Sequence, residues 1–162
     1  MTISDELHRA LALLAVLGCG LIAGVFFAFS SFVMRALARL PTAEGIAAMQ
    51  SINVVVLNPL FLTVFVGTAA VGLLAMTAAV LRWDRPGAVY ALSGGALYVF
   101  GTFAVTRAFN IPRNDALAEL VPTAPDAAEH WARYVSGWTS WNHVRTAAAL
   151  AATACFGLAL AS

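Results

Sequence analysis

The sequence predicts an all-α integral membrane protein built as a bundle of four transmembrane helices. Of its 162 residues, 61% are hydrophobic and only 10% are charged, whereas a soluble domain carries about 25% charged residues. So few charges cannot cover a water-facing surface. Four apolar stretches each reach the roughly 20 residues that a helix needs to cross a bilayer. Lipid is therefore the expected surroundings of this chain, and helices satisfy their backbone hydrogen bonds there.

The four spans form a single predicted domain, 1–162. The second and third spans are joined by a tight polar turn, Arg82–Gly87, and Gly94 and Gly95 narrow the third for close helix packing. Pro59 is expected either to kink the second span or to begin it. The predicted spans are about 7–34, 54–81, 88–108 and 141–161.

The connections between the spans are also expected to be partly helical. The first holds a short amphipathic helix that starts near Thr42, a good capping residue. The third connection, 110–140, is expected to be helical from Asp126 and to lead into the last span. Four crossings place both termini and the Arg82–Arg85 turn on one side of the membrane. Nearly all unusual polar residues then fall on the other side, where the working site is expected.

Charge constrains partners and orientation. The net charge of +1 gives no reason to expect nucleic acid, and the expected partner is the lipid bilayer, with monomer and homo-oligomer both open. More arginines fall on the polar-site side than on the terminal side, which favours a cytoplasmic location for that side. The expected localisation is a multi-pass membrane protein, in the cell membrane if the source is bacterial. Cys19 and Cys155 lie inside apolar runs and are expected to be inert.

The start of the fourth span carries the main candidate site. Trp138, Trp141, Asn142 and Arg145 occupy positions i, i+3, i+4 and i+7, which share one helix face. One interpretation is an interfacial aromatic belt with a snorkelling arginine. The other is a binding wall on which the indoles stack a flat aromatic molecule, while Arg145 and Asn142 hold its oxygen.

Polar and aromatic residues of the other helices are expected at the same end. Polar groups within a membrane must find partners or lose several kcal/mol, so they are functional candidates. Thr102, Thr106 and Asn110 follow at four-residue steps near the end of the third span. The remaining candidates are Arg107 beside them, Gln50 and Asn53 before the second span, and Phe29 and Ser30 near the end of the first. Their convergence is the argument for a site.

A proton acceptor is the least defined part of this prediction. Histidine suits acid–base work near neutral pH, and His143 adjoins Asn142 although it points about 100° away from that face. Asp115 is the best carboxylate, with a helix cap or an ion pair to Arg113 or Arg107 as its alternative role. A metal site would need His, Glu or Asp at i, i+3 or i+4 on the spanning helices, and none of the three histidines has such a partner there. No metal or cofactor is predicted, although haem or an acquired metal stays open.

Four segments resemble the anthrone oxygenase family of small four-helix membrane proteins. They are Phe29–Leu37, Met49–Asn53, Phe109–Leu117 and Trp138–Arg145, in the expected order over nearly the whole chain. Some members of this family convert a polycyclic anthrone to an anthraquinone with dioxygen. The resemblance implies a lipophilic aromatic substrate and dioxygen as co-substrate.

Local chemistry then suggests roles for the candidates. Asn142, Arg145 and Arg107 would bind the developing oxyanion, His143 or Asp115 would accept the proton, and Trp138, Trp141 and Phe29 would stack the ring. The alternative hypothesis is a non-enzymatic membrane module, either a small-molecule carrier or a helper subunit of a membrane complex. Transporters commonly show internal repeats, and no convincing repeat is present.

Overall fold

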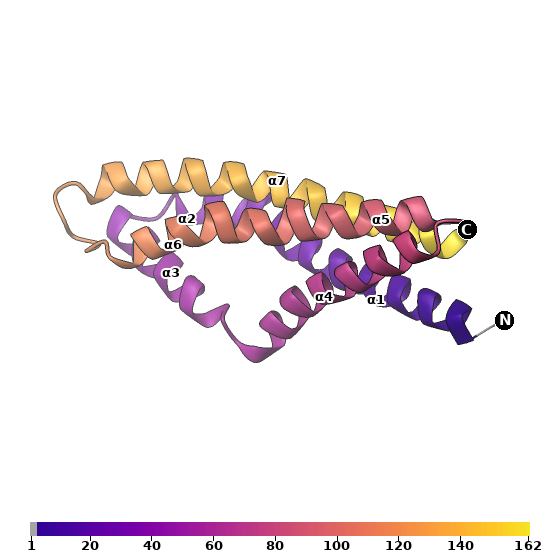
Figure 1. Cartoon of the computed structure of the whole chain (residues 1–162). Coiled ribbons are helices and arrows are strands. Elements are labelled where there is room, and N and C mark those ends of the chain that lie inside the picture. Colours follow the sequence, from indigo (N-terminus) through magenta and orange to yellow (C-terminus); the bar gives the residue numbers. More distant parts are fainter. Residues whose placement is uncertain (1–2) are drawn as a thin grey trace.

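The computed structural model describes residues 3–162, and within that range every regular element is helical (Figure 1). The beginning of α1 and the end of α7 lie at the same end of an elongated bundle, as four crossings require. In chain order the elements are α1 (Ile3–Ala28), η1 (Phe29–Val33), α2 (Met34–Leu37), α3 (Thr42–Val55), α4 (Pro59–Leu81), α5 (Ala88–Ala96), η2 (Leu97–Ala104), η3 (Thr106–Asn110), α6 (Ile111–Ala118) and α7 (Ala127–Ala161).

The four predicted spans are confirmed. Four continuous helical stretches of the described chain are long and apolar enough to cross a membrane, so the chain is a multi-pass membrane protein. The third and fourth stretches extend further at the polar end than their apolar cores predicted. They are Glu6–Leu37, Pro59–Leu81, Ala88–Ala118 and Ala127–Ala161.

The first connection contains the predicted short helix, α3, which packs on α6 and α7. A sharp elbow at 56–58 separates α3 from α4 (Figure 1). The Asn58 side chain accepts a hydrogen bond from the Phe61 N–H at 3.0 Å, and Pro59 is the first residue of α4. Proline is favoured there because the first helical N–H has no partner within the helix. Of the two roles expected for Pro59, it therefore begins the helix.

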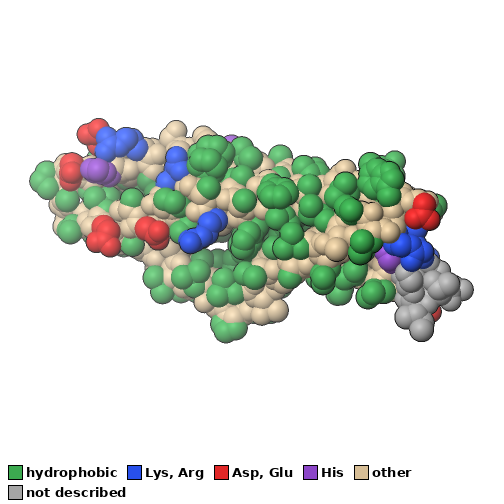
Figure 2. Space-filling model, in the orientation of Figure 1, with side chains coloured by type: hydrophobic (Ala, Val, Ile, Leu, Met, Phe, Trp, Pro, Cys, Tyr) green, Lys and Arg blue, Asp and Glu red, His purple; other side chains and the backbone are tan. Residues whose placement is uncertain are grey.

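Helix lengths place the membrane boundary near this elbow. With 23 residues, α4 is about 35 Å long, enough to cross a hydrocarbon core of about 30 Å. With 35 residues, α7 is about 52 Å long, so its first half extends beyond that core. Exposed charged side chains, Glu129 and Arg133, lie on this extension. Figure 2 shows charged residues gathered at the two ends and hydrophobic ones between them.

The buried hydrophobic residues form two clusters, one on each side of this membrane boundary. The cluster within the membrane joins α1, α4, η2 and α7 through Phe26, Phe65, Tyr98 and Phe156. The second lies at the polar end, where α2, α3, α6 and the start of α7 meet around residues such as Met34, Met49, Leu117, Trp131 and Trp138. Arg145 lies where these two clusters meet, because its guanidinium contacts Phe26 of the first cluster and Trp138 of the second.

The backbone is widened to π-helical geometry on both sides of that junction. In η1 the Met34 N–H bonds to the Phe29 carbonyl, and after η3 the Ile111 N–H bonds to the Thr106 carbonyl, each an i→i+5 step. Such segments are rare in helices and frequent at functional sites. Here they carry Ser30, Thr106 and Asn110.

Close packing between α4 and α5 gives a first test of the fold. A Cβ on Gly95 would lie 2.7 Å from the Gly72 carbonyl oxygen, which is backbone and cannot turn aside. We expect Gly95→Ala to destabilise the protein by about 1–3 kcal/mol through overpacking, seen as a lower melting temperature in detergent. Gly24→Ala is the matched control, because nothing lies within 4 Å of its Cβ position. Equal melting temperatures for the two variants would contradict this packing.

Candidate functional site at the membrane boundary

Asn142 is the centre of a buried polar cluster. Its side chain is 0% exposed, and its Nδ2 donates to the Phe26 carbonyl at 2.8 Å and to Ser30 Oγ at 2.7 Å. Ser30 Oγ in turn lies 3.2 Å from Thr146 Oγ1, which donates to the Asn142 carbonyl at 2.7 Å. The amide therefore ties α7 to the end of α1, where the helix widens into η1.

Arg145 is the second member of the cluster and is 5% exposed. Its Nε donates to Asn142 Oδ1 at 2.8 Å, and its NH1 donates to Thr106 Oγ1 at 3.2 Å. Two rings pack on the guanidinium, with Cζ 4.0 Å from the centroid of Phe26 and 4.7 Å from that of Trp138. Counted back from the end of α7, Arg145 lies about 24 Å along the helix, near the inner edge of the membrane boundary.

The guanidinium has more hydrogen-bonding capacity than this cluster uses. It carries five N–H donors, and the contacts to Asn142 and Thr106 occupy two. No ion pair to Arg145 is present among the described residues. Removing a cation from water costs several kcal/mol, and each desolvated cation–π contact returns about 2 kcal/mol of this cost. Three of its donors therefore have no hydrogen-bond partner among the described residues, and no carboxylate there pairs with its charge. The guanidinium is thus available to bind an anionic or carbonyl oxygen.

Aromatic and amide groups close the cluster towards the polar end. The Tyr134 hydroxyl and Trp138 Nε1 both donate to Asn114 Oδ1, at 3.0 and 2.9 Å. Asn110 is fully buried and donates to the Trp138 carbonyl at 3.2 Å, while its own Oδ1 has no partner among the described residues. A surface groove of about 330 Å³ between α6 and α7 reaches Tyr134 from the water side.

The structure brings together part of the predicted site. Trp138, Asn142 and Arg145 share a buried face of α7 as expected, with Ser30 and Asn110 beside them and the Phe29 ring 5.6 Å from that of Trp138. Trp141 lies at the edge of this face and stacks on Phe109, with ring centroids 3.5 Å apart. Phe26, and not Trp141, is the second ring that packs on the guanidinium beside Trp138.

Other candidates lie outside the buried cluster. Arg107, Asp115 and His143 are exposed. The Gln50 amide donates to the Leu117 and Leu120 carbonyls, at 2.8 and 3.0 Å, and so caps the end of α6. Asn53, on the same helix, lies beside Tyr134, and its Nδ2 has no acceptor among the described residues. Both belong to α3, which forms one wall of the polar end.

Thr146 and the role of Asn114 were not predicted from the sequence. Thr146 lies four residues after Asn142, so helical spacing alone could have placed it near the cluster. Asn114 lies within the segment Phe109–Leu117 but was given no role, because the two hydrogen bonds that it accepts from another helix cannot be predicted from residue spacing.

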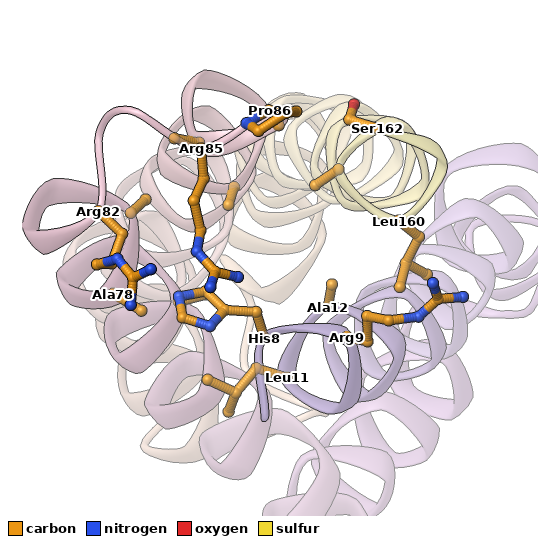
Figure 3. Close-up of a pocket in the computed structure, with 16 residues that line it drawn as sticks. His8, Arg9, Leu11, Ala12, Ala78, Arg82, Arg85, Pro86, Leu160 and Ser162 are labelled. Carbon is orange, nitrogen blue, oxygen red and sulfur yellow. The ribbon is translucent and has the colours of Figure 1, made fainter. Parts of the chain in front are cut away.

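A second cavity lies at the opposite end of the bundle, where no site was expected. It has a volume of about 320 Å³ and is lined by residues of α1, α4, α5, α7 and the turn between α4 and α5 (Figure 3).

Metal binding has no preformed centre among the described side chains, because no three His, Cys, Asp or Glu residues converge. The absence of a cofactor stays a prediction from sequence.

The fold and the cluster together define a class: a four-span membrane protein with a buried guanidinium–amide pair at one membrane boundary. Comparison with known families narrows this class. Residues 60–155 match the model of the family described as anthrone oxygenase, and the chain belongs to that family. The matched range holds Thr106, Asn110, Asn142 and Arg145. No curated protein and no solved structure matched the chain.

Proposed function

We propose that the protein oxidises a lipophilic polycyclic aromatic of the anthrone type to its quinone with dioxygen, without a resident cofactor. The observation that carries this proposal is the buried Arg145 guanidinium, which has unused donors and no carboxylate partner within the described part of the chain. A fixed cation in apolar surroundings stabilises a developing oxyanion strongly, because it needs no reorganisation during the reaction. Membership of the anthrone oxygenase family supports the substrate class.

The reaction needs only a proton acceptor and an oxyanion site. An anthrone carries a CH₂ group opposite its ring carbonyl, and loss of one proton gives an aromatic enolate whose charge rests on that oxygen. The enolate carbon gives electrons to O₂ and forms a C–O bond, and a returning proton completes a hydroperoxide. Loss of the remaining C–H proton, cleavage of the O–O bond and release of water give the second carbonyl. One oxygen atom of O₂ enters the quinone and the other enters water.

Residues of the cluster fit this sequence of steps. The free N–H edge of Arg145 would hold the oxyanion, while Asn142 fixes the guanidinium through the 2.8 Å bond to its Nε. Trp138 and Phe29, whose rings pack together, would flank the flat substrate. Neutral anthrones partition into lipid, which suits a site at the membrane boundary.

Access from the bilayer is proposed along a row of aromatic rings. Phe61 near the start of α4 stacks on Phe65 at 5.8 Å, and Phe65 packs on Phe103 at 5.3 Å and Phe26 at 6.3 Å. Phe26 contacts Arg145. Figure 2 shows a small gap between the α3–α4 elbow and the helices above it. A planar ligand entering there would pass from lipid to the guanidinium over aromatic surface.

Oxygen uptake by purified protein tests the proposal. The full chain in detergent would receive a model anthrone under ¹⁸O₂, after metal analysis and an absorption spectrum. We expect one O₂ consumed per anthrone, one labelled oxygen in the quinone, and neither stoichiometric metal nor a haem band. Uptake no faster than the uncatalysed background would overturn the enzymatic proposal, and binding without turnover would instead support a carrier or helper subunit.

The proton acceptor can be identified separately. His143 and Asp115 are both exposed, so conservative changes there should leave folding intact. We expect His143→Gln or Asp115→Asn, whichever removes the acceptor, to lower kcat while leaving KM nearly unchanged, because neither residue contacts the oxyanion site. Steady-state oxygen uptake measures both constants. Unchanged kcat in both variants would remove these two residues from the mechanism.

Orientation is proposed as polar end towards the cytoplasm. The exposed arginines of that end, among them Arg35, Arg39 and Arg107, outnumber those of the terminal end. Thiol labelling of Asp115→Cys from each side of sealed vesicles would test this, and labelling only from outside intact cells would contradict it.

A further inference from the structure

Large apolar side chains protrude at the elbow between α3 and α4. Val54 is 73% exposed and Leu60 is 78% exposed, and Val55 and Leu57 between them are exposed as well. In Figure 2 hydrophobic side chains lie at the tip of this elbow, which stands away from the rest of the bundle. Neither α3 nor residues 56–58 belong to the four candidate spans, so spanning does not account for this exposed apolar surface.

The elbow also lies in a long stretch without charge. Between Glu44 and Arg82 the sequence contains no Asp, Glu, Lys, Arg or His. The turn at the other end of α4 is different, because it carries Arg82, Asp84 and Arg85. Contiguous apolar surface is rare on water-facing parts of proteins and indicates an interaction with a partner or a membrane. The two ends of α4 are therefore suited to different surroundings.

Polar groups of the elbow are paired within the elbow itself. Asn58 Nδ2 donates to the Val55 carbonyl at 3.0 Å, and Asn58 Oδ1 accepts from the Phe61 N–H at 3.0 Å. The Leu57 N–H bonds to the Val54 carbonyl at 3.2 Å, and Pro59 has no N–H. A break between helices is tolerated at membrane depth when side chains satisfy the freed backbone groups in this way.

The length and inclination of α4 set the depth of the elbow. Figure 1 shows α4 inclined to α7. At a tilt of about 30°, within the range of transmembrane helices, its length of about 35 Å spans about 30 Å along the membrane normal. This distance equals the thickness of the hydrocarbon core. With the charged α4–α5 turn at one edge of that core, the elbow lies at the other edge, within reach of acyl chains.

We propose that the elbow anchors the polar end of the protein in the membrane interface, with its apolar side chains inserted between the acyl chains of one leaflet. Interfacial segments bury their apolar faces about 5–10 Å into this boundary. The exposed side chains Leu62 and Val66 continue this surface along α4, so the elbow and the lipid-facing side of a membrane span form one surface. This lipid contact does not depend on the proposed oxidation.

Nitroxide labels at single cysteines measure the insertion. The full chain with Cys19→Ala and Cys155→Ala would be labelled at Leu57→Cys and placed in phosphatidylcholine vesicles. EPR power saturation would then compare collisions with oxygen, which concentrates in acyl chains, and with a water-soluble nickel chelate. We expect the Leu57 label to collide mainly with oxygen, as a label at Val66→Cys should. Both positions are exposed, so the labels should leave the fold intact.

Asp84→Cys is the matched control, because it places the label in the exposed turn at the other end of the same helix. Its collision rate with the nickel chelate should be several-fold higher than that of the Leu57 label. A label at Glu44→Cys, near the start of α3, should also face water. Equal nickel access at Leu57 and Asp84, or a Leu57 label no deeper than the Glu44 label, would overturn the proposal.

The same spectra distinguish lipid from a second copy of the chain. A Leu57 label covered by another protomer would be shielded from both reagents. Its spectrum would also show dipolar broadening that disappears on dilution with unlabelled protein. That result would replace the lipid contact with a homo-oligomer interface and overturn the proposal.

Discussion

Arg145→Met is expected to abolish anthrone-dependent oxygen uptake while leaving the protein as stable as wild type. Loss of one preorganised oxyanion donor costs about 10²–10³-fold in kcat, and here a full charge is lost with it. Met has a similar length and no charge, so the rings of Phe26 and Trp138 keep a packing partner. The rate of quinone formation and the melting temperature would be measured on the same sample.

We expect unchanged stability because two contributions to the free energy of unfolding oppose each other. Replacing a buried charge with an apolar side chain often stabilises a protein by about 1–4 kcal/mol. Asn142 Oδ1 and Thr106 Oγ1 each lose a donor, at about 1–3 kcal/mol per unsatisfied group. The net change in the free energy of unfolding is therefore close to zero. A change of 1 kcal/mol would shift the melting temperature by about 2–4 °C in a protein of this size.

Arg107→Met is the control, because it removes an exposed arginine near the same membrane boundary. It should keep most of the activity if only Arg145 holds the oxyanion. A stable Arg145→Met variant with full activity would remove Arg145 from the site. A variant that melts far below wild type would show that the guanidinium is structural.

Asn142→Ala is expected to lower both stability and activity. The substitution removes two donated bonds and one accepted bond in a fully buried position. It leaves the Phe26 carbonyl and the Arg145 Nε without these partners. At about 1–3 kcal/mol for each group, we expect a loss of at least about 3 kcal/mol, or roughly 6–12 °C in melting temperature.

Asn58→Ala provides the matched control for this change. Asn58 also accepts a hydrogen bond, from the Phe61 N–H, but it is exposed at the elbow. Loss of such a helix cap costs about 1 kcal/mol. If Asn142→Ala destabilises the protein no more than Asn58→Ala does, the buried cluster does not hold α1 and α7 together. Arg145→Met and Asn142→Ala thus separate the proposed catalytic role of the cluster from its structural role.

At the polar end, residue spacing within a helix predicted part of the candidate site. Helical spacing placed Trp138, Asn142 and Arg145 on one face, and the structure has them there. Spacing could not show that Trp141 turns aside to stack on Phe109 or that Phe26 lies against the guanidinium. These contacts depend on how α1 and η3 pack against α7, which is a long-range property. The proton acceptor and the substrate stay predictions.

At the terminal end, the sequence did not predict the cavity that the structure contains. Arg9, Arg82 and Arg85 were visible in the sequence and were counted only for orientation. Their convergence around a cavity depends on small alanines in four helices leaving space at one level of the bundle, and no single segment records that.

The sequence by itself determined the four spans, because apolar length and scarce charge leave a chain no alternative to helices in lipid. It also determined which residues are costly to bury, since polarity is a property of each side chain. Only the tertiary structure decided which of these residues meet. Arg145 is exceptional because its neighbours are Asn142, Thr106, Phe26 and Trp138, and no carboxylate among the described residues pairs with it. This set of neighbours is decided by packing between helices that are distant in sequence.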